Sequence, residues 1–215
     1  DIFPERKRRT KSWESLNLYA QIAHKLGLYA IKSELEDLSL KYLETEAYNH
    51  IVHELKESEK ERMAFIEEFL KPIRELLDRD GLKYHIKSRT KSVYSIFQKM
   101  RKQKVSFKGV YDIFALRIII DCPVEREKAL CWTVYSHVAS LYTPNPERMR
   151  DWISIPKSNG YESLHTTVSA GGGKWVEVQI RTERMDEVAE RGIAAHWRYK
   201  GVKQGGMGAE EWLQR

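Results

Sequence analysis

The sequence has little cysteine, few chain breakers in its first third and no long apolar run. Its only cysteines, Cys122 and Cys131, are not in the close pairs typical of zinc sites or redox dithiols. We interpret both as packing residues in a reducing compartment. No apolar run approaches the roughly 20 residues that a membrane-spanning helix needs, and no apolar segment follows the basic N-terminal stretch. We therefore expect a soluble, cytoplasmic protein.

The composition favours an anionic partner. The 215 residues include 37 Lys and Arg against 31 Asp and Glu, which gives a net charge of +6 and a pI near 9.1. Such a balance suits a nucleotide, a nucleic acid or an acidic lipid. With 41% hydrophobic residues, the chain can bury one sizeable core, or one core and a smaller helical unit. Both ends are abrupt, and we expect them to be cut points inside a longer polypeptide.

Two compositional regimes divide the chain. Residues 1–80 contain one glycine, Gly27, and repeat apolar residues at helical intervals, which predicts an all-helical segment. Residues 81–200 alternate short β-rich runs with helices and form the second expected unit. Residues 201–215 are glycine-rich and are predicted to be a flexible tail or the start of a linker.

The second unit predicts a mixed sheet. Strands are expected at 82–88 and 114–121, and helices from about Ser92 and over 124–141. Runs 161–170 and 174–182 flank a triple glycine, which is typical of a hairpin, and a helix over 182–200 closes the unit. The expected fold class is therefore α/β (α+β), with helices flanking a mixed sheet and an all-helical segment preceding it.

The helix that begins near Ser92 divides its faces. Its apolar face consists of Val93, Ile96, Phe97 and Met100. Lys91, Ser95 and Lys99 recur every four residues on another face, beside a helix N-terminus whose free N–H groups favour an anion. This second face predicts a polyphosphate site. The alternative is an ordinary solvated basic stripe.

Two carboxylates are expected on neighbouring strands. Asp112 immediately precedes the apolar run 114–121, at a strand end where ligands commonly approach an α/β sheet. In the run 174–182, strand alternation places Glu177, Gln179 and Arg181 on one face and the valines and isoleucine on the other. An Asp and a Glu so placed would hold Mg²⁺ together with substrate phosphates. The alternatives are a turn residue for Asp112 and a solvent face for the strand.

A possible nucleobase platform follows the turn at residues 156–160. Tyr161, Ser163 and His165 are expected to share one face of a strand. Lys157 and Asn159 add polar groups beside the tyrosine ring. Stacking on such a ring contributes about 1–3 kcal/mol per base. An ordinary packing pair of Tyr161 and His165 is the alternative.

Four segments resemble, in order and spacing, the synthetase domain of RelA/SpoT homologues. They are YSIFQKM, YDIFALRIII, PKSNGYESLHTTV and EVQIRTERMDEVAERGIAAHW, and the likeness covers about residues 87–200. The resemblance implies a nucleotidyltransferase-like fold. It also implies synthesis of the alarmones ppGpp or pppGpp of the stringent response. In that reaction, with Mg²⁺ as cofactor, the pyrophosphate of ATP moves to the ribose 3′-hydroxyl of GDP or GTP and AMP is released.

The resemblance also implies roles for individual residues. For ATP they are Arg89, which stacks on the adenine, and the phosphate-binding Lys91, Ser95 and Lys99. Asp112 is similar to the Mg²⁺ ligand, and Glu177 to the carboxylate that assists the metal and activates the 3′-hydroxyl. For GDP or GTP they are the guanine-stacking Tyr161 with Lys157, Asn159, His165 and Gln179.

The segment ERMRDW is similar to the family's specificity loop R-x-K-D, here Arg148, Met149, Arg150 and Asp151. Its basic character resembles the bifunctional synthetase/hydrolase enzymes, and arginine in place of lysine leaves the choice between GDP and GTP open. Residues 16–43 resemble the end of a hydrolase domain. The hydrolase His-Asp motif is absent from this chain, so no alarmone hydrolysis is expected from it. The implied neighbours are an upstream hydrolase domain and downstream regulatory domains, with any ribosome contact made through those missing regions.

Two other functions compete with synthesis. The basic pI, the run of Arg and Lys through Lys104 and the strand aromatics suit a nucleic-acid-binding module. That function needs no paired carboxylates. A catalytically silent, nucleotide-binding regulatory domain is the other alternative.

Overall fold

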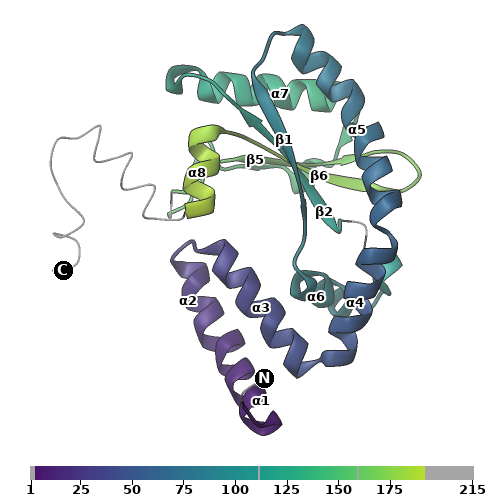
Figure 1. Ribbon diagram of the computed structural model, residues 1–215. Coiled ribbons are helices and arrows are strands. Elements are labelled where there is room, and N and C mark those ends of the chain that lie inside the picture. The colour runs from purple at the N-terminus through teal and green to yellow at the C-terminus, as the bar shows by residue number, and fades with distance from the viewer. Residues whose placement is uncertain (1–2, 111, 159, 192–215) are drawn as a thin grey trace, which may run out of the picture.

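A computed structural model describes residues 3–110, 112–158 and 160–191. The N-terminal part is helical, as predicted. In Figure 1 its first helices lie below the sheet, and its last helix, Glu59–Arg79, runs up alongside the sheet. Its elements are α1 (Glu5–Glu14), the π-helical turn Ser15–Tyr19, α2 (Ala20–Lys25), α3 (Tyr29–Leu43), α4 (Thr45–Glu57) and α5 (Glu59–Arg79). No helix in these described ranges is both long and apolar enough to span a bilayer.

The remaining elements follow the predicted order, with two short strands added. They are β1 (Tyr84–Thr90), α6 (Val93–Gln103), β2 (Phe114–Ile120), α7 (Glu127–Leu141), β3 (Thr143–Pro144), β4 (Arg150–Asp151), β5 (Leu164–Ser169), β6 (Trp175–Thr182) and α8 (Glu183–Arg191). Single 3₁₀ turns occur at Phe107–Gly109, Val124–Arg126 and Pro146–Arg148. Strands β3 and β4 have two residues each, too few to show an alternating pattern in the sequence. The predicted tail and the end of the last helix lie outside the described residues.

The strands form one mixed sheet in the order β1-β2-β6-β5-β3, with β4 also paired to β5. Strands β2 and β6 are parallel neighbours, and the other pairs are antiparallel. The expected hairpin of β5 and β6 is confirmed. Its turn contains Gly171, Gly172 and Gly173 at φ of 83°, 56° and 75°, a left-handed region that glycine enters without steric cost.

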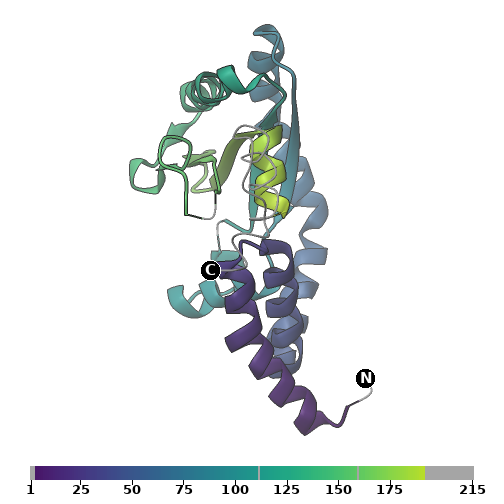
Figure 2. The ribbon, with the colours of Figure 1, turned by 90° about the vertical axis from the view of Figure 1, so that its left-hand side faces the viewer.

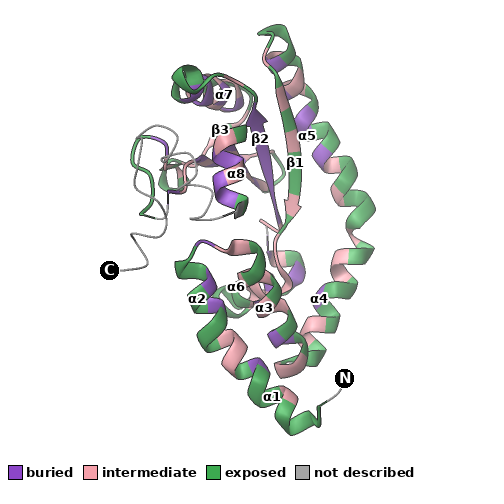
Figure 3. Cartoon of the chain, turned by 60° about the vertical axis from the view of Figure 1, so that its left-hand side comes forward, coloured by how far each residue is buried: buried purple, intermediate pink, exposed green. Residues whose placement is uncertain are grey.

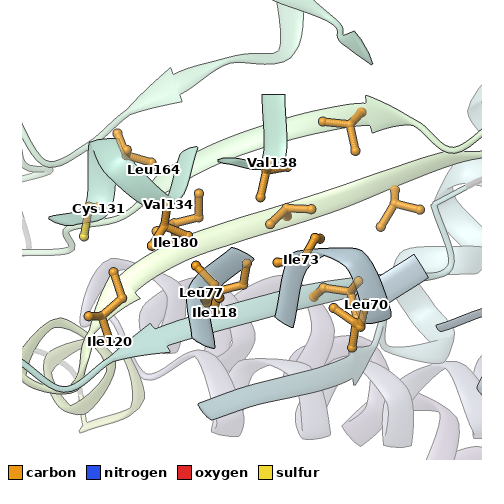
Figure 4. Packing of buried hydrophobic residues seen from close by; sticks show 14 of the residues in the cluster. Leu70, Ile73, Leu77, Ile118, Ile120, Cys131, Val134, Val138, Leu164 and Ile180 are labelled. Carbon is orange, nitrogen blue, oxygen red and sulfur yellow. The ribbon is translucent and has the colours of Figure 1, made fainter. Parts of the chain in front are cut away.

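Helices α5 and α7 cover one face of the sheet and form the main core. Figure 4 shows Leu70, Ile73 and Leu77 of α5 over the β-strand side chains, with Val134 and Val138 of α7 beside them. Each such buried aliphatic side chain contributes roughly 1.5–3 kcal/mol of transfer free energy. Every residue of β2 is buried, as expected for a central strand, and Figure 3 shows this strand in purple.

A second, smaller core attaches α6 to the N-terminal helices. Ile96 of α6 packs with Ile51 of α4 and with Phe107, and the predicted apolar face, Val93, Phe97 and Met100, lines this cluster. Helix α6 also contacts α3, and α3 contacts α8. Figures 1 and 2 show the N-terminal helices lying alongside α6, below the sheet. The face of the sheet opposite α5 and α7 is thus bordered by α8 and α3.

Candidate active site

The first turn of α6 is capped twice. Ser92 is the N-cap: its Oγ accepts the N–H of Ser95 at 3.2 Å and donates to the Ser95 hydroxyl at 2.8 Å. The backbone N–H of Tyr94 donates to Oδ1 of Asp37 on α3, at 2.8 Å. The expectation of free N–H groups at this end is therefore wrong for Tyr94 and Ser95, because protein oxygens already accept them.

Two lysines and two carboxylates meet beside α6. Lys91 Nζ lies 2.9 Å from Oδ2 of Asp112 and 2.8 Å from Oε2 of Glu177. Lys99 also pairs with Oδ2 of Asp112. We call Lys91, Lys99, Asp112 and Glu177 the carboxylate-lysine cluster. The predicted proximity of Asp112 and Glu177 is confirmed, since both contact the same Lys91 Nζ. Their strands are neighbours, with Glu177 of β6 opposite Ala115 of β2.

The cluster is largely shielded from water, so its charges act strongly on one another. The side chains of Lys91, Asp112 and Glu177 are 20%, 15% and 22% exposed. Burial raises the pKa of each carboxyl, but other groups outweigh it. Lys99 and Lys91 hold the pKa of Asp112 below its ordinary value, and Lys91, with Gln179 and His165, does the same for Glu177. Burial and the charge of Lys91 lower the pKa of Lys99, whereas the two carboxylates keep the pKa of Lys91 raised. At neutral pH both carboxylates are therefore ionised.

A chain of hydrogen bonds continues from the cluster across the sheet. Gln179 donates to Oε1 of Glu177 at 2.8 Å and accepts from Nε of Arg117 at 3.2 Å. Arg117 then donates to Glu190 of α8 at 2.6 Å. This chain holds Glu177 in a fixed orientation from the side opposite Lys91. The predicted polar face of β6 is thus a connected network rather than a solvent face.

The predicted base platform is assembled next to Glu177. The Tyr161 hydroxyl lies 2.7 Å from Nε2 of His165, and His165 Nδ1 lies 3.9 Å from Oε1 of Glu177. Lys157 Nζ lies 5.1 Å from the centre of the Tyr161 ring. Strand β5 begins only at Leu164, so Tyr161 and Ser163 precede it, contrary to the predicted strand face. Asn159 lies outside the described residues.

Ser163 does not line this platform. Its side chain is fully buried, and its hydroxyl donates to the carbonyl of Ile180 at 3.1 Å. It fixes the approach of the chain to β5 rather than offering a group to a ligand. Burial raises the pKa of Tyr161, so its hydroxyl remains protonated at neutral pH.

His165 predicts a loss of stability in mild acid. Burial lowers the pKa of His165 to about 4, from the ordinary histidine value of 6.5. Between these values the unfolded chain binds a proton that the folded protein does not, so stability falls as pH falls through this window. The expected loss is on the order of 1–3 kcal/mol between pH 7 and pH 4.5. Urea unfolding at several pH values measures it.

The matched variant for this prediction is His165→Gln, which keeps a polar side chain but does not titrate. It should show a shallower dependence of unfolding free energy on pH than the wild type over the same range. Equal slopes for the two proteins would assign the acid sensitivity to other groups.

The remaining predicted residues border this network. Arg89 of β1 lies in the same cross-strand row as Ala115 and Glu177, and burial together with Arg117 lowers its pKa. Arg150 pairs with His165 in the ladder of β4 and β5, and its guanidinium donates to the carbonyls of Glu147 and Met149. Arg148 is exposed. Asp151 accepts the N–H groups of Ile153 and Ser154 and so shapes the loop that follows it.

Sequence reasoning missed two residues of this region. Arg117 lies inside the run FALRIII, which reads as an apolar strand, yet it shares a row with Lys87 and Gln179. Strand alternation was the available signal: Ala115 and Arg117 are two residues apart on β2, so they share a face, and they stand opposite Glu177 and Gln179. Asp37 gave no such signal, because it lies 57 residues from its partner Tyr94.

The fold and the cluster define an α/β protein with two lysines and two carboxylates gathered beside α6. Comparison with known proteins then places the chain in a family. A model described as "Region found in RelA / SpoT proteins" matches residues 88–204, more than half of the chain. The chain therefore belongs to the RelA/SpoT family, and the predicted fold class and family are both confirmed.

Its relatives carry two kinds of name. The chain is 42% identical over 215 residues to a guanosine-3′,5′-bis(diphosphate) 3′-pyrophosphohydrolase of Aquifex aeolicus, covering 99% of this chain and 30% of the relative. It is 39% identical over 218 residues to a GTP pyrophosphokinase of Escherichia coli, covering 99% and 29%. The chain thus spans about 30% of the length of these relatives.

A structural comparison finds the small alarmone synthetase 1 of Bacillus subtilis bound to pppGpp. The identity is 25%, the TM-score is 0.41, and the match covers 69% of this chain and 79% of the other.

Proposed function

We propose that this chain carries the synthetase site of its family and transfers pyrophosphate from ATP to the 3′-hydroxyl of GDP or GTP. The observation that carries the proposal is the carboxylate-lysine cluster, in which two acids and two cations meet and Oε1 of Glu177 lies 3.9 Å from Nδ1 of His165. The GTP pyrophosphokinase name of the Escherichia coli relative supports the same reaction.

The donor side is formed by α6 and β1. Lys91 and Lys99 supply two positive charges for the phosphates of ATP, and the Ser95 hydroxyl, now bonded to Ser92, supplies a third donor. Arg89 is the group proposed to stack on adenine. For phosphoryl transfer, such positioning and charge neutralisation supply most of the catalysis.

The acceptor side is formed by β5, β6 and the turn before β5. Tyr161 offers a ring for guanine, and His165, Gln179, Lys157 and Asn159 are the proposed polar contacts. The 3′-oxygen attacks the β-phosphorus of ATP, the bond from that phosphorus to the bridging oxygen breaks, and AMP leaves with that oxygen and the electron pair. The proton of the hydroxyl passes to Glu177, whose low pKa keeps it ionised and able to accept.

The residues present fit a divalent cation. Oδ2 of Asp112 and Oε2 of Glu177 both lie within 3 Å of Lys91 Nζ, so one ion could reach an oxygen of each carboxylate. In the described ranges no third His, Cys, Asp or Glu joins them, and Mg²⁺ is commonly bound by one or two carboxylates with substrate phosphates and water. When bound there, Mg²⁺ would neutralise phosphate charge.

The test is to incubate the protein with ATP, GDP or GTP and Mg²⁺, and to separate the nucleotides by anion-exchange chromatography. Formation of AMP together with ppGpp or pppGpp is the expected result, and the two acceptors in parallel give the preference that Arg150 leaves open. Unchanged substrates with measurable nucleotide binding would favour the silent regulatory domain. Salt-sensitive RNA binding that survives Asp112→Asn, without turnover, would favour a nucleic-acid-binding module.

A further inference from the structure

Helix α3 reaches the proposed site at two points. The ring of Tyr29, at its first residue, lies 6.3 Å from the ring of Tyr161 in an edge-to-face arrangement. Two turns further on, Asp37 accepts the N–H of Tyr94 in the first turn of α6. One helix from the N-terminal segment therefore contacts both the acceptor platform and the helix that presents Ser95 and Lys99.

The two caps of α6 accept different N–H groups: Ser92, the N-cap residue, accepts that of Ser95, and Asp37 accepts that of Tyr94 from the neighbouring helix α3. Burial raises the pKa of Asp37, only partly offset by the N–H groups of Tyr94 and Val93 and by the charge of Lys32. A carboxylate is thus held in a partly buried place where its charge is poorly compensated. Part of the compensation comes from the N–H groups at the positive end of α6, the position that a phosphate would use.

We propose that Asp37 is a residue of the donor subsite that occupies the anion position at the N-terminus of α6 and opposes the binding of the phosphates of ATP. This inference rests on the proposed function. Three groups at this end of the site are matched by carboxylates of the protein: Lys91 by Glu177, Lys99 by Asp112, and the Tyr94 N–H by Asp37. The Ser95 hydroxyl is matched by the hydroxyl of Ser92 instead.

The sign of the effect follows from charge. A triphosphate bound at α6 brings several negative charges close to Asp37, and like charges at such distances repel with energies of kcal/mol size in a partly buried site. Asp37→Asn removes the charge but keeps an amide oxygen that accepts the Tyr94 N–H. The cap and the fold are therefore retained, and only the repulsion is lost.

The experiment is calorimetric titration of wild type and Asp37→Asn with the ATP analogue whose α- and β-phosphorus atoms are joined by methylene, in the presence of Mg²⁺, and separately with tripolyphosphate. Asp37→Asn should bind both about five- to tenfold more tightly, and GDP with unchanged affinity. Glu34→Gln, an exposed carboxylate on the same helix, is the matched control and should change neither affinity. Thermal unfolding of each variant checks that the fold is intact.

The outcomes separate this inference from the proposed function. Tighter tripolyphosphate binding by Asp37→Asn in a protein that makes no alarmone would support the role of Asp37 and reject the synthesis. Alarmone synthesis by a protein whose Asp37→Asn variant binds both anions no more tightly than wild type would overturn the role of Asp37. A gain of the same size in Glu34→Gln would also overturn it, because the effect would then be one of net charge.

Discussion

Asp112→Asn and Glu177→Gln are each expected to lower alarmone synthesis by about 10³-fold or more while the domain stays folded. A lost general base lowers the rate by about 10²–10⁴, and a lost electrostatic stabiliser by a similar factor.

The affinity for ATP should not fall together with the rate. The cluster holds two lysines and two carboxylates, so removing one acid leaves a net positive charge beside the phosphates. Asp112→Asn should therefore bind free ATP, without Mg²⁺, at least as tightly as wild type.

Initial rates from product chromatography and titration with ATP measure the two effects separately. Asp121→Asn, beyond the other end of β2, and Glu125→Gln are exposed carboxylates and serve as matched controls with wild-type rates. Wild-type turnover in either cluster variant would contradict the assignment of that residue to the catalytic site. A rate loss that merely tracks a loss of folded protein, as seen by circular dichroism, would reduce their role to stability.

The parts of the site that sequence could predict are those governed by local periodicity. Strand alternation is sufficient to separate Glu177 and Gln179 from the buried Val176 and Val178, because it depends only on neighbouring residues. The helical repeat placed Ile96 in a core by the same reasoning. The sequence also led us to expect Asp112 and Glu177 on neighbouring strands, and β2 and β6 are neighbours in the sheet; that they pair in parallel was not predicted.

The parts that could not be predicted depend on contacts between distant segments. The position of α3 across the site is set by helix packing, whose geometry leaves no pattern around Asp37 itself. The ion pairs of Lys91 could not be predicted from the sequence either. A basic face predicts an anion, but only the folded chain shows that Asp112 and Glu177 are the anions paired with Lys91.

The second large effect is expected from replacing Lys91, which joins Asp112 and Glu177. Lys91→Met keeps the length of the side chain and removes the cation shared by Asp112 and Glu177. Breaking a buried ion pair by deleting one partner typically costs about 3–5 kcal/mol. Because these side chains are partly exposed, we expect a destabilisation of about 3 kcal/mol at pH 7. Synthesis should fall by more than about 100-fold, because a phosphate-neutralising charge is lost. Urea unfolding and initial rates measure the two quantities. Lys102→Met, an exposed position of α6, is the control and should change neither.

The pH dependence of this variant distinguishes loss of the charge from loss of packing. In wild type the pKa of Glu177 is held low, so its contribution to stability is present above the unfolded pKa and is lost as pH falls through the folded one. Without Lys91 the burial of Glu177 is no longer outweighed, and its pKa should rise above that of the unfolded chain. Protonation then stabilises the folded variant, so its stability deficit relative to wild type should shrink between pH 7 and pH 5. A deficit that stays constant over this range would show that Lys91 acts through packing of its aliphatic chain, and not through the two carboxylates that it joins.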